Sequence, residues 1–359
     1  MHSFVYTALP ARVVFGPGTL AQVPDEVRRL GCRRALVLST PQQVNEAQAL
    51  ADTLGDLGAG AFGEAAMHTP TEITERAVAA VKDTDIDCLV ALGGGSTIGL
   101  GKAMALRTGL PQVVIPTTYA GSEATPILGE TRDGLKTTQR TLDVLPEVIV
   151  YDVNLTLSLP PQMSATSGIN AMAHAVEALY AQDANPIISC LAEQGIEALA
   201  RSLPVIMQDP GNREARSDAL FGAWACGTCL GNVGMALHHK LCHTLGGSFG
   251  LPHAETHTII LPHAVAYNAV AAPEAITRVA YAIGASDAAQ GLFDFAVALG
   301  VSIALKDLGM QEAGLDRAAE LAVASPYWNP RPIDHAGIRR LLDDAFRGRR
   351  PASARAYAS

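Results

Sequence analysis

The stretch Asp87-Cys-Leu-Val-Ala-Leu-Gly-Gly-Gly-Ser96 decides the fold class of this chain. The apolar run after Asp87 is typical of a strand buried on both faces of a parallel sheet. Three glycines and a serine follow it, and residues 97–107 then have a helical pattern. A strand, a glycine turn and a helix in this order predict one β-α unit of an α/β domain.

Further strands and helices alternate on both sides of this unit. The predicted strands cover residues 12–15, 34–39, 112–116 and 147–152, and the predicted helices cover residues 20–30, 44–57 and 71–82. After Pro160-Pro161 the strand pattern ends, and alanine-rich segments with a 3.6-residue period continue to about residue 347. We therefore predict an α/β domain with a parallel sheet at residues 1–159, an all-α domain at 160–347 and a flexible tail at 348–359.

Composition restricts the partners and the compartment. The chain has 359 residues, of which 48% are hydrophobic and 17% charged, so it can bury a large core. A net charge of −9 argues against a nucleic-acid or anionic-membrane partner. Residues 1–5 lack the basic and apolar pattern of a signal peptide, and the six cysteines are scattered, so we expect a cytoplasmic protein. Cys226-Gly-Thr-Cys229 has redox-motif spacing, but its apolar helical surroundings favour two buried small residues.

The glycine turn has two interpretations. Glycines let the backbone approach a phosphate, and the following helix N-terminus offers free N–H groups, so Gly93–Ser96 can bind an anion. The turn can equally be a tight structural connection. It does not match the dinucleotide fingerprint, because Ile98 stands where the third glycine is needed, and it does not match a P-loop, because Ser96 and Ala103 are wrong for one.

A second polar turn favours the ligand interpretation. Thr117, Thr118 and Ser122 follow another predicted strand, at the sheet edge where ligands of open α/β sheets bind. Two such turns on one edge predict a dinucleotide. The first strong strand ends in Ser39-Thr40 rather than in a carboxylate that would repel a 2′-phosphate, so NADH and NADPH should both be tolerated.

Histidines mark the second half of the chain. Seven of the ten histidines lie between His174 and His263. His239 and His243 are four residues apart and therefore share a helix face, as do Asn170 and His174. His253 follows a glycine-rich turn and can return to the same place. Histidines packed in a helical core are the plain alternative, but this spacing favours a site of four potential ligands, Asn170, His174, His239 and His253.

Five motifs give the chain a family resemblance. They are Gly93-Gly-Gly-Ser-Thr-Ile-Gly-Leu-Gly-Lys102, Tyr119-Ala-Gly-Ser-Glu123, Gly168-Ile-Asn-Ala-Met-Ala-His174, the His238–His253 stretch, and Pro326-Tyr-Trp-Asn-Pro-Arg331. Together they resemble the iron-containing alcohol dehydrogenase family over nearly the whole chain, and within it the maleylacetate reductase branch. The resemblance implies a dehydroquinate synthase-like fold, with a dinucleotide-binding N-terminal domain and a helical catalytic domain, and it suggests a homodimer.

The resemblance also implies residue roles. The family's metal ligands fall on Asn170, His174, His239 and His253, and its histidine beside the nicotinamide falls on His243. Its pyrophosphate turn falls on Gly94, Gly95 and Ser96, with further cofactor contacts at Thr117, Thr118 and Lys136; to these the two-turn argument adds Ser122 and Thr40. The chain departs from metal-dependent members at Asn170 and Gly99, where they carry Asp. A neutral amide is a poorer ligand for a hard cation, so we expect that a metal is not required.

The implied reaction is the NADH- or NADPH-dependent reduction of maleylacetate to 3-oxoadipate in the degradation of aromatic compounds. His174, His239 and His253, partly protonated beside a dicarboxylate, are then expected to take over the role of the cation, with Asn170 as a further catalytic residue. His243 is expected to supply a proton as the general acid. The substrate is a small dicarboxylate, and the candidate anchors for its carboxylates are Lys136, Arg140, Lys240 and Arg331. Two alternatives remain open: a metal-dependent alcohol dehydrogenase, and a non-catalytic dinucleotide-binding sensor.

Overall fold

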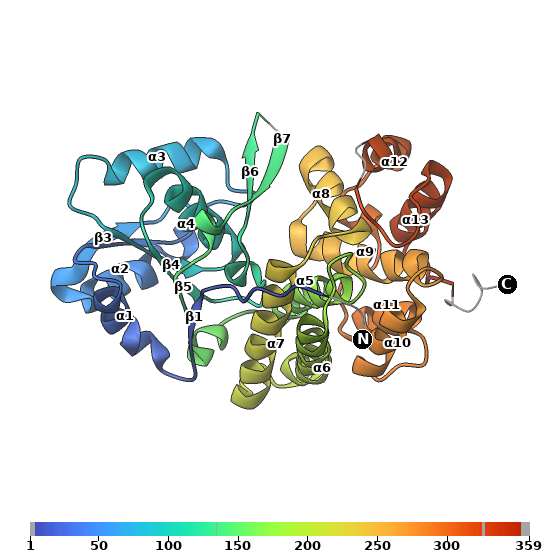
Figure 1. Cartoon of the computed structure of the whole chain (residues 1–359), viewed down its shortest axis with the longest axis horizontal. Helices are drawn as coiled ribbons and strands as arrows, with labels where there is room; N and C mark the ends of the chain where they lie inside the picture. The colour runs from blue at the N-terminus through green and yellow to red at the C-terminus, as the bar shows by residue number, and fades with distance from the viewer. Residues whose placement is uncertain (1–3, 134, 325–326, 353–359) are drawn as a thin grey trace. The chain divides into compact units, whose positions relative to one another are not determined.

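The computed structural model describes residues 4–133, 135–324 and 327–352, apart from the side chains of Leu135 and Lys136 (Figure 1). By its internal contacts the chain divides into an α/β unit, Leu9–Leu159, and a helical unit that begins at Pro160. Residues 4–8 belong to the helical unit, although the predicted first domain included them. The α/β half followed by an all-helical half confirms the predicted fold class.

The α/β unit is built on one parallel sheet of six strands, in the order β1-β8-β5-β4-β2-β3. The strands are β1 Arg12–Phe15, β2 Ala35–Leu38, β3 Gly58–Phe62, β4 Cys88–Gly93, β5 Gln112–Pro116 and β8 Val148–Tyr151. Sequence analysis missed β3 and placed residues 44–57 in one helix, whereas α2 ends at Thr53. The sequence of β3 is Gly-Ala-Gly-Ala-Phe, which lacks the β-branched residues that mark a strand.

Alternate residues of the strands pack on opposite faces of this sheet. Val37 and Val90 join a core with the helices α1 (Val23–Arg29) and α2 (Val44–Thr53). Leu36 and Leu89 join a second core with α3 (Thr71–Val81) and α4 (Gly95–Thr108). Burial on both faces explains why these strands have continuous apolar sequences.

The order of the strands identifies the edge of the sheet where a ligand is expected. The chain runs from β2 outward to β3 and then returns to the other side of β2 as β4, so its direction reverses between β2 and β4. Ligands of open α/β sheets bind at such a switch point, beyond the carboxyl ends of the strands. Thr40 follows β2, and the glycine turn follows β4.

A two-stranded antiparallel ribbon, β6 (Ile127–Arg132) and β7 (Leu135–Arg140), was not predicted. Its sequence is largely polar and has no clear alternation of apolar residues. The signal available was Asp133-Gly134, because an Asp-Gly pair between two short runs is typical of a hairpin turn.

The helical unit contains nine α-helices among its described residues. They are α5 Pro161–Leu179, α6 Pro186–Gln208, α7 Arg213–Asn232, α8 Leu237–Phe249, α9 His253–Asn268, α10 Pro273–Ala282, α11 Ala288–Ala298, α12 Leu315–Ala324 and α13 His335–Arg347. Cys226 and Cys229 lie buried in α7 with free thiols, as predicted. In the described part of the chain no single helix is long and apolar enough to cross a membrane; α7 and α8 pass such a test only as a pair, bent by 99°.

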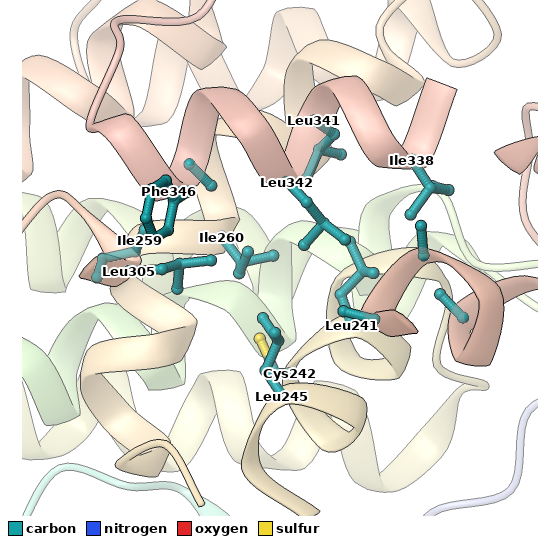
Figure 2. Packing of buried hydrophobic residues seen from close by; sticks show 14 of the residues in the cluster. Leu241, Cys242, Leu245, Ile259, Ile260, Leu305, Ile338, Leu341, Leu342 and Phe346 are labelled. Atoms are coloured by element: carbon teal, nitrogen blue, oxygen red, sulfur yellow. The ribbon is translucent and has the colours of Figure 1, made fainter. Parts of the chain in front are cut away.

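The helix α8 is held by its apolar face. Leu241 and Leu245, four residues apart, pack with Ile260 of α9 and Leu342 of α13 in a fully buried cluster (Figure 2). The helix passes through Gly246 and Gly247 and ends at Gly250, which has the left-handed conformation of a helix C-cap, with φ of 68°. His239 and His243 are therefore positioned by the packing of the leucines beside them.

The predicted tail is ordered where the structure describes it. Arg349 forms ion pairs with Asp343 and Asp344, Arg350 pairs with Asp294, and Pro351 is buried. Residues 349 and 350 therefore contact α13 and α11 through ion pairs that the predicted flexible tail did not include. Residues 353–359 lie outside the described part of the chain.

A buried histidine makes the stability of the fold depend on pH. His263 of α9 is 4% exposed, and burial lowers its pKa to about 4. Because the unfolded chain binds this proton near pH 6.5 and the folded chain does not, stability should be lost as pH falls from about 6.5 to about 4, by up to about 3 kcal/mol. In a plot of the free energy of unfolding, measured with denaturant, against pH, His263→Leu should reduce the slope between pH 4 and 6.5 by the amount that one bound proton contributes. His335→Gln, at an exposed histidine, is the control; equal slopes in His263→Leu and the parent would contradict the assignment.

Candidate active site

Two positions of the glycine turn, Gly93 and Gly94, have no room for a side chain. A Cβ on Gly93, whose φ is 154°, would lie 2.4 Å from Thr97 Oγ1, and a Cβ on Gly94 would lie 2.8 Å from Thr118 Cγ2. The amides of Thr97 and Ile98 bond to the Gly94 carbonyl. The first amides of α4 have no acceptor inside the helix, so this turn presents N–H groups at the positive end of the helix dipole.

The second turn lies against the first. The amide of Thr117 donates to the carbonyl of Gly93 over 3.1 Å, which joins the ends of β4 and β5. Ser122 is half-buried, its shielded hydroxyl oxygen has no hydrogen-bond partner among the described residues, and this Oγ would be 4.0 Å from a Cβ on Gly95. An unpartnered hydroxyl beside free helix amides fits an anionic group such as a pyrophosphate.

The structure therefore brings most predicted cofactor residues to one sheet edge. Thr40, Gly94, Gly95, Ser96, Thr117, Thr118 and Ser122 all follow the carboxyl ends of β2, β4 or β5. Lys136 is in β7, where it pairs with Thr131, and its side chain lies outside the described residues. No carboxylate follows β2 at Ser39-Thr40.

In the helical unit, one face of α5 carries the other part of the candidate site. Asn170, His174 and Glu177 are spaced by four and three residues, and all three are buried. His174 Nδ1 is 2.8 Å from His239 Nε2, and His239 Nδ1 is 2.6 Å from Glu177 Oε2. A hydrogen-bonded chain thus runs from a buried carboxylate through two imidazoles.

Glu177 also fixes the start of α8. Its two oxygens accept from the amides of Ala236 at 2.9 Å and His238 at 2.7 Å, in addition to His239. A carboxylate that receives three donors has to be acceptor-only, so the proton of His239 lies on Nδ1. In a neutral His239 the Nε2 atom is then an acceptor, and His174 donates to it through Nδ1–H.

His243 and His253 complete the imidazole cluster and are less buried than His174 and His239. The rings of His239 and His243 are 6.2 Å apart between centroids, and those of His253 and His257 are 4.3 Å apart. His253 was expected in a loop after the glycine-rich turn. In the structure it is instead the first residue of α9.

Sequence analysis gave no role to Glu177, His238 or His257. The signal for Glu177 was its helical spacing from Asn170 and His174 in an otherwise apolar segment. His238, Cys242 and His257 are buried, and their nitrogen and sulfur atoms lie within 4.8 Å of one another.

The spacing of these three side chains would suit a metal ion. Their hydrogen bonding instead favours a pair of packed histidines, His238 and His257, without a metal. His238 Nε2 and His257 Nδ1 share a hydrogen bond of 2.9 Å, and burial lowers the pKa of both rings, so they are neutral. The opposite nitrogens, His238 Nδ1 and His257 Nε2, have no partner in the described part of the chain. If both rings bound a cation, the two opposite nitrogens would each carry a proton, and two buried N–H donors would have no acceptor. With the hydrogen bond between the rings, only one buried N–H donor has no acceptor.

His174, His239 and His253 have the chemistry of a divalent-cation donor set, because imidazole suits zinc and iron and a carboxylate such as Glu177 can support a metal-bound histidine. Their arrangement here is not that of a metal site, since Nε2 of His239 is hydrogen-bonded to His174 and its Nδ1 to Glu177. The amide of Asn170 adds no charge to this set. Two predicted carboxylate anchors have local contacts: Arg331 lies over the Tyr267 ring and donates to its carbonyl, and the ammonium of Lys240 lies over the Tyr327 ring.

Comparison with known proteins identifies the family. Residues 10–153 match the family model "Iron-containing alcohol dehydrogenase", and residues 164–346 match "Fe-containing alcohol dehydrogenase family, C-terminal". The chain belongs to the iron-containing alcohol dehydrogenase family.

Its relatives within the family are similar over their full length. Maleylacetate reductase from Rhizobium sp. (strain MTP-10005) is 58% identical over 98% of this chain and 100% of the relative. The crystal structure of maleylacetate reductase from Agrobacterium tumefaciens has a TM-score of 0.94 at 59% identity, with coverage of 98% of this chain and 100% of that one. An iron-containing alcohol dehydrogenase from Corynebacterium glutamicum has a TM-score of 0.92 at 42% identity, with 99% of each chain covered.

Proposed function

We propose that this chain is an oxidoreductase that reduces the C=C bond of maleylacetate to give 3-oxoadipate, with NADH or NADPH as the hydride donor. The observation that carries the proposal is the identity of 47–58% to several maleylacetate reductases over nearly the whole chain. The site supports it, because the phosphate-type turns and the imidazole cluster supply the two parts that such a reaction needs. We further propose a cytoplasmic homodimer that has no nucleic-acid or membrane partner.

The reaction requires an activated alkene rather than an alkoxide. Hydride from the nicotinamide adds to the alkene carbon β to the ketone, and the electron pair moves to the ketone oxygen to give an enolate. A proton then joins the carbon α to the ketone, so the C=C bond becomes CH–CH and the cofactor leaves oxidised. Donors aimed at the ketone oxygen stabilise the developing charge.

We assign these donors to the imidazole cluster. Glu177 holds the proton of His239 on Nδ1, and the chain of hydrogen bonds sets the orientation of His174. The more exposed His243 and His253 are the candidates to donate, with His243 as the general acid. If a divalent cation is bound, His174, His239 and His253 would hold it, and it would supply Lewis-acid polarisation of the ketone.

The absence of a carboxylate at Asn170 supports catalysis that does not require a metal. Three imidazoles and an amide give the cluster no anionic ligand of its own to retain a hard cation. A ligand set without a carboxylate also avoids repulsion of a dicarboxylate substrate. A turn without a carboxylate after β2 supports the use of either NADH or NADPH.

The function is tested by following NADH and NADPH absorbance with maleylacetate before and after exhaustive chelation, with the metal content measured on the same samples. Oxidation that survives chelation is expected. Oxidation that is lost and returns with zinc or iron would contradict the metal-independent mechanism. Oxidation of simple alcohols with NAD⁺, without maleylacetate turnover, would favour the alcohol dehydrogenase, and cofactor binding without any turnover would favour the sensor.

The role of His243 is tested by His243→Ala, which should lower kcat by on the order of a hundredfold or more because the proton donor is lost. The fluorescence-measured Kd for NADH should stay within about twofold, since binding at the turns does not need the general acid. His335→Ala, at an exposed histidine, is the matched control. An unchanged kcat in His243→Ala would remove this residue from the mechanism.

A further inference from the structure

Lys102, in the middle of α4, has no role in the chemistry above, yet it is 1% exposed. Its ammonium donates to the carbonyls of Ser122 at 2.6 Å, Thr125 at 2.7 Å and Ile127 at 2.9 Å, and it lies 3.0 Å from Thr125 Oγ1. A buried charge is costly unless it is paired and hydrogen-bonded, and here three N–H groups meet four acceptors. All four acceptors come from the segment that directly follows the second turn.

Glu123 provides the balancing charge within the same segment. It is fully buried, and its Oε1 accepts from the hydroxyl of Tyr151 over 2.8 Å. Burial lowers the pKa of Lys102 to about 7, and Glu123 opposes that shift. Burial likewise raises the pKa of Glu123 to about 7, opposed by Tyr151 and Lys102. The four acceptors around Lys102 favour its ammonium form. The carboxylate of Glu123 interacts with this ammonium through its charge, without a direct hydrogen bond between the two.

This arrangement links the two turns that fit the cofactor. Lys102 is on α4, the helix that begins at the glycine turn, and it holds the carbonyl of Ser122 at the end of the second turn. The hydroxyl of that same Ser122 is unpartnered and faces Gly95. The position of the hydroxyl relative to the helix amides therefore depends on the contact that Lys102 makes with the backbone of Ser122.

We propose that Lys102 is a positioning residue for the nicotinamide cofactor, which holds Ser122 so that its hydroxyl and the N-terminal amides of α4 bind one pyrophosphate together. The proposal rests on the proposed function, since it assumes that the turns bind a dinucleotide. Lys102 itself is enclosed by protein oxygens and does not touch the ligand.

The test compares Lys102→Met with Arg107→Met. Arg107 joins the same helix to β6 through Glu130, at 2.8 Å, but does not contact the turn. Both variants should lose thermal stability. Only Lys102→Met should raise the Kd and KM for NADH, by about tenfold or more, with kcat changed by less than about threefold, because the lost contact acts on cofactor binding. Ser122→Ala should raise the Kd in the same direction, and Arg107→Met should leave it within about twofold.

Three results separate the possibilities. A parent protein that binds neither NADH nor NADPH would overturn the proposed function itself. A parent that binds NADH, with a Kd unchanged in a folded Lys102→Met, would overturn this inference alone and leave Lys102 as a structural ion. If Lys102→Met does not fold, Ser122→Ala and Thr125→Val, which removes one of the four acceptors, are decisive: an unchanged Kd in both would overturn the inference.

Discussion

The carboxylate of Glu177 is the interaction on which the catalytic half of the molecule depends. It receives three hydrogen bonds, two from the backbone at the start of α8 and one from the ring of His239. The first two fix where α8 begins, and the third fixes which nitrogen of His239 carries the proton. The contact to His174 then extends this order to α5. One buried carboxylate therefore fixes both the start of α8 and the orientation of the His239 and His174 rings.

In the α/β unit, too, a buried charged side chain lies behind the neutral groups that fit a ligand. The phosphate-type turns of this unit contain no cation that could bind a pyrophosphate directly, and they rely on helix amides and a serine hydroxyl. The buried ammonium of Lys102 donates to the backbone carbonyl of Ser122, the residue that carries this hydroxyl. In both units a buried charge organises neutral donors. Such donors suit a doubly anionic substrate and a cofactor that is taken up in one redox state and released in another.

Much of this was accessible from the sequence, and the failures have physical reasons. The strands β2, β4, β5 and β8 have apolar sequences because both sheet faces are covered, so periodicity located them. The strand β3 was missed because glycine and alanine give no β signal, and the ribbon was missed because its sequence is largely polar. Helical spacing paired Asn170 with His174 and His239 with His243, and the family resemblance placed His174 with His239, whose ring nitrogens lie 2.8 Å apart. Helical spacing could not show that Glu177 of α5 is hydrogen-bonded to His239 of α8. Contacts between helices that are far apart in the sequence leave no periodic pattern in it.

The most direct measurement of the central claim is the effect of Glu177→Gln on chelated, metal-free protein. The amide keeps the size of the carboxylate but presents a donor where His239 needs an acceptor. The account predicts that kcat with maleylacetate falls by about 10- to 100-fold while the Kd for NADH is retained, by analogy with the loss of carboxylates that support histidines. Glu193→Gln, at a partly exposed glutamate paired with Arg278, should leave kcat unchanged. A metal-free Glu177→Gln protein with the kcat of its parent would contradict the account.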